Sequence, residues 1–450
     1  MKKNKIDVVV LGAGLTGLAT ADFLLKSGFK VLVLEKEKEA GGLAKTFTFD
    51  GFKFDLGGHR LYFNNKKLIN YVRSMAKSEL IFKRRKSSIF LKGQYLNYPP
   101  RFFDCFRHSF SSIFKIIYDH FRLFGKNKKG GSTFKEWVIS RFGVTVHDIY
   151  FHAYSYKTWG LRTDMISSLL AKRRIGMLNS SLIIKEMFTQ HSRVKENARY
   201  FYYPTEGIGS LSRDLMESVL KNNGEVILDA RIQNISYENN KLQSLFYYKG
   251  GEQIKVEFST LISTIPLLAL TKLLFSEQQN AMHDLFQLIR YRDLILVFLV
   301  IDKESVFDSQ WIYFPDFDIP FARITEPKNW STTMSRKNMT SLCVEIFCQA
   351  GDKYWNMPDD DLVKMTREAL EKFKAVLKSE VKGALVKRIP YAYPLMYLGY
   401  EKDLTMVLSQ VLKFNNLQLC GRNGTHSYLD MEECLSDAQQ TAASLVGEIR

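Results

Sequence analysis

The 450-residue sequence is poor in cysteine and in long hydrophobic runs, and both shortages exclude classes of protein. Its five cysteines are scattered without metal-binding or redox spacing, so they predict buried thiols and no metal ligand. The longest apolar run, 294–301, is too short to cross a bilayer. No low-complexity linker or internal repeat is present. The apolar stretch near the N-terminus belongs to a predicted strand, so we expect no export signal and a cytoplasmic protein.

Acidic residues are also scarce relative to basic ones, and the formal net charge is +17. Much of the excess lies between residues 83 and 129, where segment 101–129 combines seven phenylalanines with seven lysines and arginines. No recognition module accompanies the charge, so nucleic acid is not a predicted partner. Three alternatives stay open for segment 101–129. It could contact the inner membrane surface, attract an anionic substrate, or form a solvated basic face over a core-facing aromatic stripe.

A glycine-rich turn follows the first predicted strand. Residues 8–11 predict a buried strand and residues 18–27 a helix. The glycines between them, in G-x-G-x-x-G spacing, are Gly12, Gly14 and Gly17. In such a unit the glycines allow a tight turn and let the backbone approach a pyrophosphate at the helix N-terminus. A second strand over 30–34 ends at Glu35, whose carboxylate can bind ribose hydroxyls. The pattern therefore predicts a bound dinucleotide.

The stretch after Glu35 distinguishes a flavin from a nicotinamide dinucleotide. Gly41 and Gly42 give a second close approach of the backbone. Residues 45–57 predict a β-hairpin with Asp50-Gly51 as its turn, and Gly57-Gly58-His59 follows. This order resembles the glutathione-reductase-type FAD domain of the amine oxidase and UDP-galactopyranose mutase superfamily. FAD is therefore the expected cofactor.

Five segments resemble UDP-galactopyranose mutases and together span nearly the whole chain in order. They are DLGGHRLYF (55–63), GQYLNYPPR (93–101), YSYKTWGLRTDMISSLLAKRRI (154–175), WIYFPDFDIPFARIT (311–325) and GRNGTHSYLDM (421–431). The resemblance implies an α/β fold in which a Rossmann FAD domain is interleaved with a helical domain and an antiparallel-sheet substrate domain. The expected boundaries are 1–80, 200–275 and 405–450 for the FAD domain, 100–199 for the helical domain, and 81–99 with 276–404 for the substrate domain.

The resemblance also implies an isomerase that uses a flavin with no net redox change. Members of this family convert the six-membered ring of a nucleotide sugar into the five-membered ring, for polysaccharide synthesis. N5 of reduced FAD attacks the anomeric carbon, and the nucleoside diphosphate leaves. The implied substrate is a nucleoside-diphosphate sugar, and the implied reductant is NADPH or NADH. A homo-oligomer is compatible with this assignment.

Individual roles follow from the matching motifs. Arg173 and Arg323 match the two diphosphate-binding arginines, and His59 matches the histidine of a loop that senses flavin reduction. These three are the expected catalytic residues. The expected substrate contacts are Tyr98, Arg101, Ser155, Trp159, Tyr393 and Tyr428. The expected FAD contacts are Gly12, Gly14, Gly17, Glu35, Gly41, Gly42, Leu43, Gly58, His59, Ile232, Arg422, Asp430 and Met431.

Three departures from the family pattern lie near the expected nucleotide pocket. Tyr98 is followed by Pro99-Pro100-Arg101, Ser155 replaces an asparagine, and Lys172-Arg173 replaces a Glu-Arg pair. The base and the sugar therefore stay open. An FAD-dependent oxidoreductase of the same superfamily, such as an amine or protoporphyrinogen oxidase or a desaturase, is the main alternative function. A flavin-bound scaffold or membrane-associated partner is a third.

Overall fold

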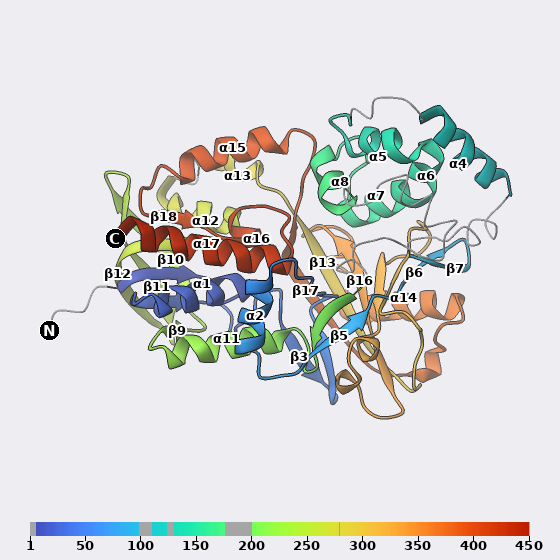
Figure 1. The fold of residues 1–450 in the computed structure, drawn as a ribbon, viewed down its shortest axis with the longest axis horizontal. Coiled ribbons are helices and arrows are strands. Elements are labelled where there is room, and N and C mark those ends of the chain that lie inside the picture. The colour runs from blue at the N-terminus through green and yellow to red at the C-terminus, as the bar shows by residue number, and fades with distance from the viewer. Residues whose placement is uncertain (1–5, 99–109, 124–129, 176–199, 279, 450) are drawn as a thin grey trace.

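The computed structural model describes residues 6–98, 110–123, 130–175, 200–278 and 280–449. Two seven-stranded sheets, the first largely parallel and the second largely antiparallel, organise these residues, and a group of helices lies at one end (Figure 1). The mixed α/β fold confirms the predicted fold class. The division into three domains stays a prediction.

The first sheet has the strand order β10-β11-β12-β1-β2-β9, with β18 paired to β12. Its strands are β1 (Ile6–Leu11), β2 (Val31–Leu34), β9 (Glu225–Ile227), β10 (Arg231–Glu238), β11 (Lys241–Lys249), β12 (Glu252–Ser263) and β18 (Leu417–Leu419). The strand pairs around β1 are parallel, and only the β10-β11-β12 pairs are antiparallel. Strand β12 belongs to both parts of the sheet, because it pairs antiparallel with β11 and its end pairs parallel with β1.

Helices cover both faces of this sheet, which explains why β1 is apolar at successive positions. Val8 and Val10 face a core shared with α1, α11 and α17, whereas Val9 and Leu11 face a core shared with α12 and α15. The bounds are α1 (Leu15–Lys26), α11 (Gly209–Lys221), α12 (Leu267–Leu274), α13 (His283–Gln287), α15 (Tyr400–Val411), α16 (Gly421–Gly424) and α17 (Met431–Ile449). The predicted helix at 18–27 thus begins earlier, at Leu15.

The second sheet has the order β17-β13-β16-β15-β14-β6-β7. Its strands are β6 (Ser87–Leu91), β7 (Gln94–Asn97), β13 (Tyr291–Ile301), β14 (Trp311–Tyr313), β15 (Arg323–Thr325), β16 (Thr340–Cys348) and β17 (Val381–Pro394). Every residue of β13 is buried, because α14 (Asp359–Lys372) covers one face of the sheet and the hairpin β3 (Thr46–Phe49)–β4 (Phe52–Asp55) covers the other. Asp50 and Gly51 both have positive φ in the turn, so the predicted hairpin is confirmed.

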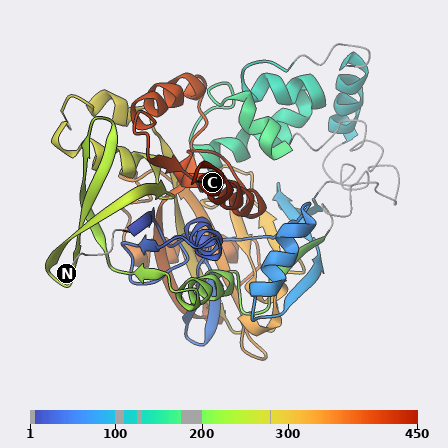
Figure 2. The ribbon, with the colours of Figure 1, turned by 60° about the vertical axis from the view of Figure 1, so that its left-hand side comes forward.

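The helical group comprises α4 (Phe110–Leu123), α5 (Phe134–Phe142), α6 (Val144–Val146), α7 (Ala153–Trp159) and α8 (Ser168–Ile175), with a π-helical turn at His147–His152. Helix α5 begins at a reciprocal capping box between Thr133 and Glu136. Figure 2 shows this group from a second direction, with α4 again at its outer edge. The remaining elements are α2 (Lys66–Met75), β5 (Leu80–Arg84) and β8 (Tyr200–Pro204).

Two further predictions concern thiols and membrane spans. Cys343, Cys348, Cys420 and Cys434 are buried free thiols, as expected, and Cys105 lies outside the described residues. Within the described ranges, no helix is long and apolar enough to cross a membrane.

Candidate functional site

Two glycine-rich loops meet at the carboxyl end of β1. Gly12 has φ +99°, and a Cβ on Gly17 would lie 2.0 Å from the Gly12 carbonyl oxygen, so only glycine fits at Gly17. Gly14 forms a bridge to Gly41, and a Cβ on Gly42 would lie 3.2 Å from the Gly14 Cα. The predicted motif glycines thus lie together, leaving backbone without side chains around the N-terminus of α1.

Glu35, which follows β2, stabilises the first glycine loop through hydrogen bonds to its carboxylate. Its Oε2 accepts a hydrogen bond from the Ala13 amide at 2.8 Å, and its Oε1 accepts one from the Glu37 amide at 3.0 Å. Glu35 is 8% exposed, and the remaining lone pairs of its carboxylate can still accept hydrogen bonds from ribose hydroxyls. Its backbone also contacts the loop before β10, since the Ala230 amide donates to the Glu35 carbonyl at 2.8 Å. Ile232, an expected FAD contact, lies two residues beyond Ala230.

A third loop, after β18, joins α1 to the second sheet. Gly421 has φ +77°, and a Cβ there would lie 2.7 Å from the Thr16 side chain. The next residue, Arg422, lies over the rings of Tyr393 and Tyr428 at 4.6 and 4.5 Å. Its Nη1 donates to the Leu429 carbonyl, whereas its buried Nε and Nη2 have no hydrogen-bond partner. Arg422 therefore has donors available for an anion.

Asp430 and Met431, both expected flavin contacts, stand at the start of α17. The Asp430 amide donates to Glu433, and the Glu433 amide donates to Asp430, both at 2.9 Å, which caps the helix. Leu43 follows Gly42 in the second glycine loop. Met431 packs against the core shared by β1 and α1. The contacts of Leu43, Asp430 and Met431 to a flavin stay predictions.

Arg323 is held rigidly on β15 by a buried carboxylate. Its Nε donates to Glu345 Oε1 at 2.8 Å and its Nη2 donates to Oε2, which forms a bidentate pair between two residues that are 6% and 0% exposed. The same Nη2 lies 3.5 Å from the Tyr393 hydroxyl. Burial alone would lower the pKa of Arg323, but Glu345 and Tyr393 raise it above its usual value. The guanidinium is a fixed positive charge.

The other expected diphosphate-binding arginine is displaced by one residue. Arg173 lies at the surface, where its side chain is 46% exposed and its Nη1 donates to Glu433 at 2.8 Å. Arg174 instead lies over the rings of Trp159 and Tyr428, at 5.6 and 5.7 Å. Burial would lower the pKa of Arg174, but Tyr428 and the other surrounding tyrosines raise it. Arg174, and not Arg173, therefore lies among the aromatic rings beside Tyr428.

Aromatic rings connect these arginines. Tyr393 and Tyr428 stack at 6.2 Å, and Trp159 contacts both edge-on. Burial would raise the pKa of Tyr428, but Arg174 and Arg422 together bring it below its usual value. Tyr393, Tyr428 and Trp159 thus lie together, as the sequence predicts. We call Arg174, Arg323, Arg422, Tyr393, Tyr428 and Trp159 the arginine–tyrosine cluster.

His59 follows a tightly packed glycine. A Cβ on Gly58 would lie 2.7 Å from the Trp311 ring, so a side chain there would displace the loop. His59 Nδ1 lies 3.1 Å from the Gly57 carbonyl, which makes Nδ1 the protonated nitrogen and leaves Nε2 as an acceptor. Burial, reinforced by Arg323 and Arg422, lowers the pKa of His59 to about 4. The imidazole is therefore neutral at pH 7.

The remaining expected substrate contacts form the far end of the site. Tyr98 packs against Tyr313 at 5.1 Å, and the Arg85 guanidinium lies 5.0 Å from the Tyr98 ring. Ser155 is buried on α7. Arg101 lies outside the described residues.

Sequence reasoning missed several residues of this site. Tyr154 contacts Tyr313 edge-on at 5.5 Å, and Trp311 lies between the guanidinium groups of Arg60 and Arg323, at 3.8 and 4.9 Å. All of these residues lie inside or beside motifs that carry the family resemblance. That position was the only indication in the sequence that they could belong to the site. Their roles could not be distinguished because a motif does not show which side chains face inward.

The residues present fit a flavin dinucleotide. The glycine loops offer bare backbone at a helix N-terminus, where a pyrophosphate binds well. Trp311 Nε1 and Thr325 Oγ1, like the two Arg422 nitrogens, are buried polar atoms without a hydrogen-bond partner. Polar atoms of this kind are normally satisfied in a complete structure. A polar ligand between the glycine loops and the second sheet would satisfy them.

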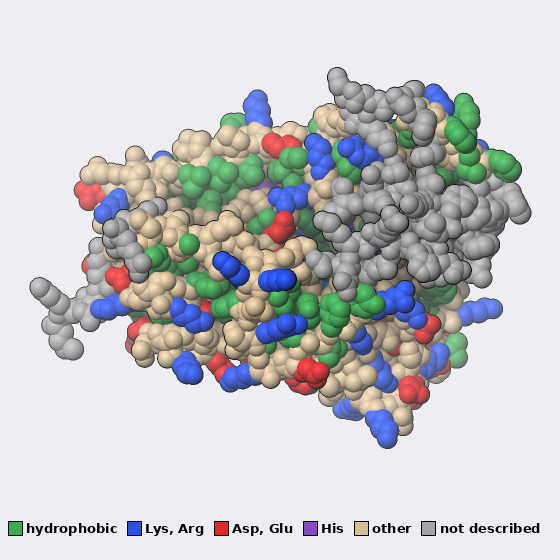
Figure 3. All heavy atoms as spheres, in the orientation of Figure 1, with side chains coloured by type: hydrophobic (Ala, Val, Ile, Leu, Met, Phe, Trp, Pro, Cys, Tyr) green, Lys and Arg blue, Asp and Glu red, His purple; other side chains and the backbone are tan. Residues whose placement is uncertain are grey.

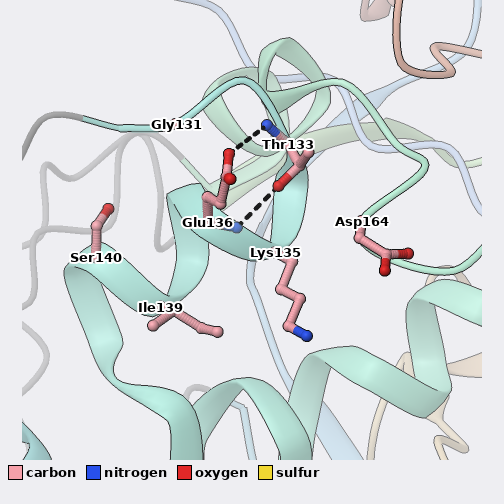
Figure 4. A pocket seen from close by; sticks show the side chains of 7 residues that line it. All are labelled: Gly131, Thr133, Lys135, Glu136, Ile139, Ser140 and Asp164. Atoms are coloured by element: carbon pink, nitrogen blue, oxygen red, sulfur yellow. Dashed lines mark hydrogen bonds between the residues drawn. The ribbon is translucent and has the colours of Figure 1, made fainter.

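A separate surface depression of about 610 Å³ lies along α5 (Figure 4). It is lined by Gly131, Thr133, Lys135, Glu136, Ile139, Ser140 and Asp164. Thr133 and Glu136 are already bonded to each other in the capping box. No residue of the arginine–tyrosine cluster lines the depression, so we assign it no ligand.

His426, next to the cluster, predicts an acid-dependent loss of stability. It is 2% exposed, and burial lowers its pKa to about 4. The unfolded chain protonates near pH 6.5, so the free energy of unfolding falls as the pH drops from about 6.5 to 4, by up to about 1.4 kcal/mol per pH unit from this residue. We expect His426→Gln to reduce that slope, measured by urea unfolding at two pH values. Equal slopes in the two proteins would contradict the assignment.

Comparison with known proteins identifies the family. The model of the family described as flavin containing amine oxidoreductase matches residues 15–446. The chain belongs to this family. Because the family is described as flavin containing, its cofactor is a flavin, and the protein is a flavin-dependent enzyme.

Within that family, similarity to individual proteins is distant. A probable UDP-galactopyranose mutase from Klebsiella pneumoniae is 20% identical over 456 residues, covering 99% of this chain and 96% of the relative. A crystal structure of reduced UDP-galactopyranose mutase superposes with a TM-score of 0.83 at 19% identity, covering 99% of this chain and 96% of that one. An inactive all-trans-retinol 13,14-reductase from Danio rerio is 26% identical over 299 residues. That match covers 58% of this chain and 47% of the reductase, so the chain spans about half the length of that relative.

Proposed function

We propose that this flavoprotein is a nucleotide-sugar pyranose–furanose mutase. The observation that carries the proposal is the arginine–tyrosine cluster, which presents cations and phenols beside the flavin-binding loops. The full-length similarity to UDP-galactopyranose mutases supports it. In this proposal the substrate is a nucleoside-diphosphate sugar, and FAD acts in its reduced form after reduction by NADPH or NADH.

The cluster is suited to hold a departing diphosphate. Arg323 is fixed by Glu345, and Arg174 is placed by Trp159 and Tyr428, so neither guanidinium has to be reorganised when negative charge develops. Planar guanidinium groups match phosphate oxygens bidentately, and the hydroxyls of Tyr393 and Tyr428 add donors. We assign these four residues to the diphosphate.

The flavin end of the site involves other residues. When bound, reduced FAD supplies the nucleophile for the anomeric carbon. Arg422, with two free donors, binds the FAD pyrophosphate in this proposal. His59 stays neutral and offers Nε2 as a hydrogen-bond acceptor, so it could accept a hydrogen bond from a protonated nitrogen of the reduced flavin without adding charge itself.

The position of Arg174 in the cluster changes how one departure from the family pattern is interpreted. If Arg174 takes the place of the family arginine, the family's Glu-Arg pair corresponds to Arg173-Arg174, and a surface cation replaces the family glutamate. Ser155 and the Tyr98 segment still differ from the family pattern at the nucleotide end. We therefore propose a nucleoside-diphosphate sugar without specifying uridine or galactose.

An FAD-dependent oxidoreductase is the second candidate. The observation that favours it is the amount of aromatic surface in the site, including Tyr98, Tyr154 and Tyr313, which would also suit a flat apolar substrate. The Danio rerio relative carries the name of an inactive reductase of that class. Arg174 and Arg422 would be poorly suited to such a substrate, because partly buried cations without an anionic partner are unfavourable.

Anaerobic turnover separates the two candidates. We expect the dithionite-reduced protein to isomerise at least one of a panel of nucleotide sugars, and the oxidised protein to be inactive, with products resolved by chromatography. Peroxide formation with an amine or porphyrinogen, together with no binding of any nucleoside diphosphate, would instead favour the oxidoreductase.

A further inference from the structure

Helix α4 exposes an apolar stripe. Phe114, Ile117, Tyr118 and Phe121 are 71, 41, 61 and 72% exposed, respectively. Their spacing of i, i+3, i+4 and i+7 places all four on one helical face. Of the three alternatives left open for segment 101–129, a core-facing aromatic stripe therefore does not hold for these residues of α4. Figure 3 shows apolar side chains protruding at the upper right, where Figure 1 places α4.

The other side of α4 is already packed against the protein. The Asp119 carboxylate accepts a hydrogen bond from the Thr145 amide at 2.8 Å, which ties α4 to the start of α6. Gly143 also lies against Asp119, since a Cβ on Gly143 would come within 2.5 Å of the Asp119 Cβ. Because Asp119 turns inward, the stripe points away from the other described elements of the helical group. Figures 1 and 2 both show α4 at its outer edge.

Basic side chains flank the stripe. Lys115 and Arg122 are exposed and seven residues apart, so they lie on the same side of the helix. The Arg122 guanidinium lies 5.8 Å from the Tyr118 ring. Among the described residues, neither side chain forms an ion pair with a carboxylate. The outward surface of α4 from 114 to 122 thus combines apolar and basic groups without an acidic one.

We propose that this face of α4 docks on an anionic membrane surface. The stripe would lie at the boundary between headgroups and acyl chains, and Lys115 and Arg122 would contact lipid phosphates. A protruding helix with aromatic residues on one face and flanking cations is the form taken by interfacial helices. The net charge of +17 favours an anionic surface over a neutral one. This proposal is independent of the reaction catalysed.

Vesicle sedimentation with the full chain tests the proposal. We expect the protein to bind vesicles of phosphatidylcholine mixed with about one-third phosphatidylglycerol, and at least about tenfold more weakly to vesicles of phosphatidylcholine alone. The double variant Phe114→Ser/Phe121→Ser should lose at least about tenfold in affinity for the anionic vesicles. Both side chains are exposed, so melting temperature and flavin content should stay unchanged.

The matched control is Phe317→Ser, because Phe317 is 58% exposed but lies outside α4. It should bind vesicles as the wild type does. The proposal would be overturned if the wild-type protein did not bind anionic vesicles, or if the double variant bound them as tightly as the wild type does. So would a loss of self-association in the double variant without any vesicle binding, since the stripe would then join two copies of the chain.

Discussion

Replacing Arg174 with alanine is expected to weaken binding of a nucleoside diphosphate to the reduced protein by about a hundredfold. Arg174 is held over Trp159 and Tyr428, and no described carboxylate neutralises it. Removing one partner of a desolvated charged contact typically costs about 3 kcal/mol. Isothermal titration calorimetry with UDP and GDP on the dithionite-reduced protein measures the change. Both nucleotides are needed because the base is not specified.

Arg173→Ala is the matched control for this experiment. Arg173 is adjacent in sequence, but it forms an exposed ion pair with Glu433, and such pairs contribute at most about 1 kcal/mol. Its variant should therefore bind the nucleotide within about fivefold of the wild type. If Arg173→Ala lost the greater affinity, the placement of Arg174 in the diphosphate site would be wrong.

Replacing Gly17 with alanine is expected to remove most of the bound flavin. The new Cβ would lie 2.0 Å from the Gly12 carbonyl oxygen, and two backbone segments would have to separate. Overpacking of this kind costs about 3 kcal/mol, and here it would distort the loop expected to bind the pyrophosphate. Flavin content per chain, measured by absorbance after purification and after titration with FAD, checks the prediction.

Gly447→Ala provides the control for the flavin experiment. Gly447 lies on α17, where an added Cβ would meet nothing within 4 Å. That variant should retain the wild-type flavin content, and circular dichroism should show both variants folded. A Gly17→Ala protein that purifies with full flavin would refute the role given to the first glycine loop.

The cofactor half of the site could be predicted from the sequence because its determinants are local. Gly12, Gly17 and Glu35 lie within one strand–helix–strand unit, and the hairpin turn at Asp50-Gly51 requires positive φ in adjacent residues. Such requirements restrict residue types at fixed spacing, so they remain visible in a single chain. FAD as the expected cofactor agrees with the flavin-containing family.

The substrate half could not be fully predicted because it depends on long-range register. Consecutive residues on a helix point about 100° apart, so a shift of one position exchanges Arg173 for Arg174 and moves the charge from the surface into the cluster. Glu345 could not be found either. It lies opposite Arg323 on the neighbouring strand, and that pairing exists only once β15 and β16 are aligned.

Counting product molecules against electrons tests the proposed mutase activity most directly. With a known amount of dithionite and no oxygen, the account predicts many molecules of isomerised nucleotide sugar per reduced flavin, with the flavin still reduced at the end. One molecule of product for each electron pair consumed would contradict it and identify the protein as an oxidoreductase.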